Sequence, residues 1–75
     1  MALASPLSPG AWLDDIFASK AAIRGQVIRR KARDIEKFVG RQEFENELKR
    51  RGFQAVENAG HVIIFCNREP IRRIA

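Results

Sequence analysis

Histidine and cysteine are the residues of this chain best suited to metal binding or nucleophilic chemistry, and the chain has one of each. His61 and Cys66 lie five positions apart on one predicted strand, and this odd separation points their side chains to opposite faces. They therefore cannot ligate the same metal ion, and the sequence predicts no metal site. Cys66 is interpreted as a small buried hydrophobic residue, because no activating group is predicted beside it.

The sequence shows no arrangement for acid–base or covalent catalysis. Local spacing places neither a serine nucleophile nor a carboxylate beside His61. Glu45 and Glu47 each precede a basic residue by four positions, which is the favourable order for ion pairs along a helix. A glycine-rich phosphate loop, a dinucleotide fingerprint and a paired CxxC motif are all absent from the sequence. We therefore expect a non-enzymatic protein without a cofactor.

The distribution of charge is the main functional signal. Fourteen Lys and Arg residues against nine Asp and Glu residues give a formal charge of +5 and a pI of about 10.4. No acidic residue lies between Asp15 and Asp34, and Glu69 is the one acid near the C-terminal arginines. Because basic stretches attract polyanions, we expect binding of DNA or RNA, mainly through phosphates. The predicted contact residues are Arg24, Arg29, Arg30, Lys31, Arg33, Lys37, Arg68, Arg72 and Arg73.

Two other interpretations of the same features remain open. The basic residues could form a solvated face that only keeps the protein soluble. The apolar run of residues 62–66 and a thin core could instead favour an interaction module, with homodimers formed by pairing across an exposed strand edge.

The sequence indicates a soluble cytoplasmic protein with one domain. A single cysteine favours a reducing compartment, because small secreted domains usually need several disulfides. No apolar run approaches the ~20 residues of a membrane span, and the first ten residues lack the features of a signal peptide. Residues 1–8 are predicted to be a flexible lead-in, and residues 9–75 a single small domain.

Three helices are predicted before the sheet. Ser8 and Pro9 are a helix-start signal, and an amphipathic stripe follows over residues 9–22. Residues 26–39 form a second stripe at helical spacing, with residues 26–30 as a strand the alternative. The third helix, residues 41–51, ends in a basic run and a capping glycine, so termination of a helix already explains that run.

An antiparallel β-hairpin follows the helices. Residues 53–57 and 61–66 have strand character, with a predicted three-residue loop between them. Residues 71–74 are expected to add a short third strand, with Pro70 at its start on a sheet edge, or to form a frayed tail. The predicted fold class is therefore α+β, with helices packed on an antiparallel sheet. If residues 26–30 are a strand, the predicted order becomes β-α-β-β-β.

The helical interpretation of residues 26–39 resembles a small winged-helix domain, with three helices followed by a hairpin. In that family the third helix enters the major groove and the hairpin touches the DNA backbone. The resemblance implies that Arg41, Gln42, Asn46 and Lys49 face the groove. Three glutamates on the same helix depart from the pattern.

The run ELKRRGF, followed by a hairpin with GHVIIF, resembles the core of Hic-type toxins over residues 44–74. Those proteins are small ribonucleases with a double-stranded-RNA-binding-like fold, and their catalytic histidine lies two residues after the hairpin glycine. Val62 holds that position here, and His61 is one residue early. The resemblance therefore implies RNA binding rather than cleavage, with ribonuclease activity a further alternative. The whole chain is also similar to small basic bacterial proteins, which implies no functional residues.

Overall fold

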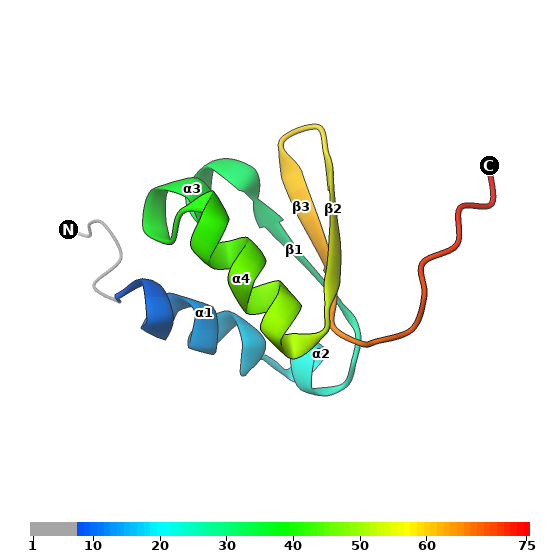
Figure 1. The fold of residues 1–75 in the computed structure, drawn as a ribbon, viewed down its shortest axis with the longest axis horizontal. Coiled ribbons are helices and arrows are strands. Elements are labelled where there is room, and N and C mark those ends of the chain that lie inside the picture. The colour runs from blue at the N-terminus through cyan, green and yellow to red at the C-terminus, as the bar shows by residue number, and fades with distance from the viewer. Residues whose placement is uncertain (1–7) are drawn as a thin grey trace.

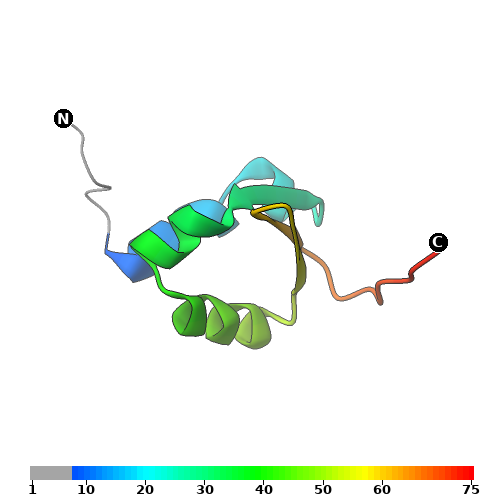
Figure 2. The same ribbon diagram turned by 90° about the horizontal axis from the view of Figure 1, so that it is seen from above.

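The structure is a computed structural model that describes residues 8–75, so the predicted lead-in lies outside the described residues except for Ser8. It has an α+β fold in which helices cover one face of a three-stranded antiparallel sheet (Figures 1 and 2). The order of elements is helix, helix, strand, helix, helix, strand, strand. No helix among the described residues is long and apolar enough to cross a membrane.

The first predicted helix is broken in two, which corrects the expectation of one helix over residues 9–22. Helix α1 spans Pro9–Phe17 and begins at Ser8, whose hydroxyl accepts a hydrogen bond from a backbone N–H three residues on. Ser19 caps α2 (Lys20–Ile23) in the same way. A second N-cap inside the amphipathic stripe starts a new helix on a new axis.

The prediction of a continuous helix over residues 26–39 is wrong, and the alternative strand forms instead. Strand β1 spans Val27–Lys31, and helix α3 (Ala32–Phe38) follows directly. β1 pairs antiparallel with the second strand of the hairpin, so that Ile28 lies opposite Ile64. This pairing satisfies the backbone of two adjacent β-branched residues, which favour extended structure.

Helix α4 spans Arg41–Arg51, the predicted bounds. Gly52 has a φ of 77° and forms the left-handed cap, as expected from the basic last turn and the glycine that follows it. The basic residues at this end therefore lie at the negative pole of the helix dipole.

The hairpin forms, with a shorter loop than predicted. β2 spans Gln54–Asn58 and β3 spans His61–Phe65, and Asn58 pairs with His61 across the turn. Ala59 and Gly60 both have positive φ, so the loop has two residues rather than three. Two positive φ values produce a turn whose twist matches that of the flanking strands.

The third strand of the sheet is β1 rather than residues 71–74, which form no strand (Figure 1). The strand order β1-β3-β2 explains this correction, because β2 and β1 occupy the two edges of β3. A strand from the C-terminal segment would therefore find no free edge on β3. The chain beyond Arg68 instead leads away from the sheet.

The core lies between the helices and one face of the sheet. Ile35 of α3 and Ile64 of β3 are its most deeply buried large side chains, at 1% and 0% exposure. Buried apolar residues from the other elements surround them: Leu13, Ile16, Phe17, Ala22, Ile28, Ala32, Phe44, Leu48, Val62 and Cys66.

Ile63 and Ile64 are adjacent on β3 and point to opposite faces, so substitution of each one tests which face of the sheet is buried. We expect Ile64→Ala to lower the free energy of unfolding by about 2–5 kcal/mol, because it leaves a cavity in the core. Ile63→Ala removes the same atoms from the partly exposed face and should cost clearly less. Denaturant unfolding followed by circular dichroism measures both. Equal losses would contradict the described packing.

Candidate nucleic-acid interface

The arginines of α4 are paired with carboxylates of the same molecule. The Arg41 guanidinium donates to Oε1 of Glu57 at 2.7 Å and lies 3.7 Å from Glu36. Through this hydrogen bond Glu57 raises the pKa of Arg41. Arg50 and Arg51 both bond to Glu47, which is buried although it is charged.

These ion pairs give the basic run at the end of α4 a structural role. Glu47 needs cationic partners because a buried carboxylate without them would be costly. Arg51 also lies 4.5 Å over the ring of Phe17 and 3.7 Å from Asp14, so it links α4 to α1. Arg50 and Arg51 of the basic run are therefore paired with carboxylates of the fold, whereas Lys49 has no such partner among residues 8–75.

The other face of the sheet has a different charge pattern. Side chains alternate along a strand, and the helices cover the face that carries Ile28, Val62 and Ile64. We call the opposite side the outer sheet face, and no helix packs on it in Figure 2. Its nine residues are Val27, Arg29, Lys31, Gln54, Val56, Asn58, His61, Ile63 and Phe65. None of these nine is acidic, and two are cations.

The structure places the predicted contact residues of β1 on two different faces of the sheet. Arg29 and Lys31 lie on the outer sheet face and are exposed. Arg30 points to the other side, is half-buried, and donates from Nη1 to the backbone oxygen of Arg29 at 2.8 Å. Arg24 is exposed at the C-cap of α2.

The remaining predicted residues lie on two further segments. Arg33 and Lys37 are exposed one turn apart on α3. The three arginines of the C-terminal segment are also exposed, and Arg68 packs against Gly52 with its Nε 3.4 Å from the backbone oxygen of Arg51. Among residues 8–75, none of the nine predicted residues forms a salt bridge. Chain order brings the cations of β1 and α3 together. The C-terminal segment begins at the other end of β1, where Nδ2 of Asn67 donates to the carbonyl of Gly25, next to Arg24.

The outer sheet face has a hollow that was not predicted from the sequence. It has a volume of about 300 Å³ and is lined by Arg29, Asn58, Ala59, His61 and Ile63. His61 and Ile63 are two positions apart on the predicted strand, which indicated that their side chains lie on the same face of the sheet. The presence of Arg29 beside them depends on the register of β1 on β3, for which the sequence carries no signal.

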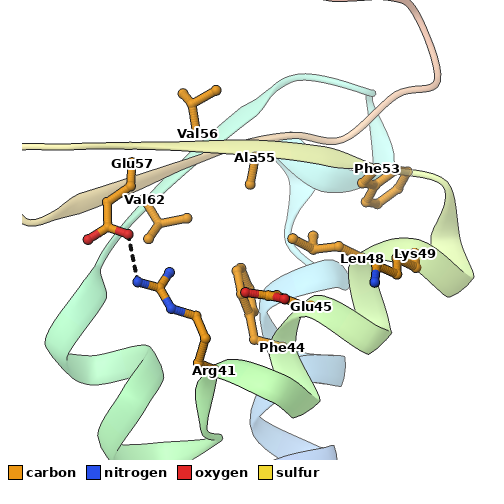
Figure 3. A pocket seen from close by; sticks show the side chains of 10 residues that line it. All are labelled: Arg41, Phe44, Glu45, Leu48, Lys49, Phe53, Ala55, Val56, Glu57 and Val62. Atoms are coloured by element: carbon orange, nitrogen blue, oxygen red, sulfur yellow. Dashed lines mark hydrogen bonds and ion pairs between the residues drawn. The ribbon is translucent and has the colours of Figure 1, made fainter.

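A second hollow lies between α4 and the edge strand β2, with a volume of about 320 Å³ (Figure 3). Its floor is apolar, and its rim carries both signs of charge. Glu45 and Glu57 on that rim disfavour a phosphate. The lining residues are Arg41, Phe44, Glu45, Leu48, Lys49, Phe53, Ala55, Val56, Glu57 and Val62.

His61 and Cys66 lie apart in the fold. His61 is half-buried on the outer sheet face, whereas Cys66 belongs to the core. Within residues 8–75, no group of three or more His, Cys, Asp or Glu side chains is placed to hold a metal ion.

Comparisons with known proteins do not identify a relative of this chain. No protein-family model matches it, and neither the curated proteins nor the solved structures contain a significant match. In the Hic resemblance the position of the catalytic histidine is Val62, which is 2% exposed and faces the helices.

The Cys66 thiol should be unreactive in the folded protein. Burial raises its pKa, so less of the nucleophilic thiolate is present at a given pH, and the side chain is also shielded from reagents. We expect slow reaction with a chromogenic disulfide reagent at pH 8, faster reaction at higher pH, and full reaction in denaturant. Equal rates for the folded and unfolded protein would contradict the buried position.

Proposed function

We propose that the protein is a small non-catalytic nucleic-acid-binding protein of the cytoplasm that contacts mainly phosphates. The observation that carries this proposal is the division of its cations. The arginines of α4 are bonded to carboxylates, whereas Lys49 of α4 and the exposed cations of β1, α3 and the C-terminal segment have no such partner among the described residues. A cation without a carboxylate partner loses no internal ion pair when it binds a phosphate.

The same division disfavours α4 as a helix that reads the major groove. Helices α3 and α4 lie directly before the hairpin, although β1 interrupts the three-helix order of the winged-helix resemblance. Arg41, however, is held by Glu57, and Gln42 donates from Nε2 to Oδ1 of Asn46 at 3.0 Å. Three of the four residues that the resemblance places in the groove are thus already engaged within the protein.

The cations of β1 and α3 form the core of the proposed phosphate-binding surface. Arg29 and Lys31 are followed directly by α3, which presents Arg33 and Lys37 to solvent. The C-terminal segment adds three arginines at the opposite end of β3. Phosphate contacts spread over these segments give affinity without base specificity.

Salt-dependent binding tests the proposal. We expect fluorescence anisotropy to detect binding of labelled DNA or RNA at low salt. The logarithm of the affinity should fall linearly with the logarithm of the salt concentration, because binding releases counterions from the nucleic acid. Failure to bind any of these ligands at low salt would refute the proposed function.

Charge-matched variants separate this surface from net charge alone. Arg33→Gln with Lys37→Gln should weaken binding and reduce the salt slope by about one for each phosphate that the variant no longer neutralises. Lys20→Gln with Lys49→Gln removes the same charge from exposed positions outside the predicted set and should have a smaller effect. Equal effects of the two pairs would reduce the binding to nonspecific charge attraction.

A self-associating interaction module is the second candidate. It is favoured by apolar exposure on the outer sheet face, where Val27 and Val56 are 50% and 44% exposed. Light scattering over a range of concentrations should then show a dimer that Val56→Lys disrupts. A monomer at all concentrations would exclude this candidate.

A further inference from the structure

We propose that the outer sheet face binds single-stranded nucleic acid, with one base in the hollow beside His61 and Ile63. This inference rests on the proposed function and adds to it the class of ligand and the place where a base contacts the protein. The contacts to phosphate would come from the adjacent cations of β1.

The register of the three strands places side chains of different chemistry next to one another, in rows that cross the outer sheet face. One row runs from Lys31 on β1 through His61 on β3 to Asn58 on β2. Neighbouring strands are about 4.8 Å apart, so each row has a width of roughly 10 Å. The row therefore offers a cation, a flat ring and an amide within the dimensions of one nucleotide.

The other two rows repeat parts of this pattern. The middle row joins Arg29, Ile63 and Val56, and the last joins Val27, Phe65 and Gln54. Lys31 and Arg29 thus provide a cation on β1 in two of the three rows. His61 and Phe65 provide a ring on the central strand β3 in two of the three rows. Aromatic rings on an open sheet, flanked by cations, are suited to stacking bases while phosphates are held at the side.

The spacing of the rings favours a single strand over a duplex. His61 and Phe65 are four residues apart on β3, which corresponds to about 13 Å along the strand. Bases stacked in a duplex follow each other at about 3.4 Å, and their faces are covered by their neighbours. Only an unstacked, extended strand could present separate base faces to the two rings.

The hollow has a lining suited to one base. Ile63 provides an apolar surface, and Arg29, Asn58 and His61 surround it with hydrogen-bonding groups. Base recognition in single strands combines these two elements, stacking on a flat or apolar surface and hydrogen bonds to the exposed edge. Its volume of about 300 Å³ leaves room for a ring system without rearrangement of the backbone.

The charge of the outer sheet face favours the binding of nucleic acid over the binding of a second copy of the chain. The one acidic residue of the three strands, Glu57, points to the other side and is bonded to Arg41. Two copies meeting through their outer sheet faces would bring four cations together with no carboxylate from those strands. A polyanion meets the same surface with favourable charge throughout.

The test compares a labelled 12-nucleotide single strand with a hairpin of the same backbone type, as RNA and as DNA, at one moderate salt concentration. We expect tighter binding of the single strand and a loss of roughly tenfold or more for His61→Ala, since stacking on a ring is lost. Asn46→Ala, on exposed α4, is the matched control and should leave affinity unchanged. Trp12 packs on Phe38 among the helices, so an unchanged emission spectrum shows that each variant is folded.

Titration of the unmutated protein followed by amide NMR gives a second measurement that needs no variant. The shifts should concentrate at residues 29–31 and 58–65 rather than on α4. Binding that is equal for both ligands, insensitive to His61→Ala and still weakened by the α3 variants would overturn this inference but keep the proposed function. Absence of binding to every ligand at low salt would overturn both. A dimer with its shifts on this face and no binding of nucleic acid would assign the surface to a second copy.

Discussion

The antiparallel pairing of β1 with β3 is the constraint on which the rest of the structure depends. It pairs residues that are 30 to 38 positions apart in the sequence. The pairing continues beyond the strands, where the backbone N–H of Cys66 donates to the carbonyl of Gln26 and that of Ala32 donates to the carbonyl of Gly60. The pairing seats Ile28 against Ile64 in the core. It also turns the alternate residues of β1, including its two exposed cations, onto the outer sheet face.

The ion pairs among residues 8–75 lie on the helical side of the sheet. Glu47 and Glu57 each engage arginines of α4, and both point away from the outer sheet face. The sheet is thereby divided into an apolar, internally neutralised side and a side that carries positive charge without carboxylates. Such a division gives a small basic protein one surface that attracts polyanions more strongly than the rest.

Parts of the fold could be predicted because their signals are local. Helix α4 and the hairpin depend on glycine caps, turn residues and short-range alternation, and all of these lie within a few residues of the element they define. Residues 26–39 show the opposite case. Ile28, Ala32, Ile35 and Val39 were assigned to one helical stripe. The first three are buried and Val39 is half-buried, but Ile28 reaches the core from a strand. The apolar residues of a strand followed directly by a helix can therefore have the same spacing as a stripe along one continuous helix.

The sequence by itself determined the identity of the cations, the α+β class, α4 and the hairpin, because composition and local propensity suffice for these. Only the tertiary structure decided which cations are available. Arg41 is paired with a glutamate 16 positions away and Arg51 with an aspartate 37 positions away, whereas Arg29 comes to lie beside Ile63 and the His61 hollow. These neighbours are set by long-range strand register and helix packing, and neither is encoded in a window of adjacent residues.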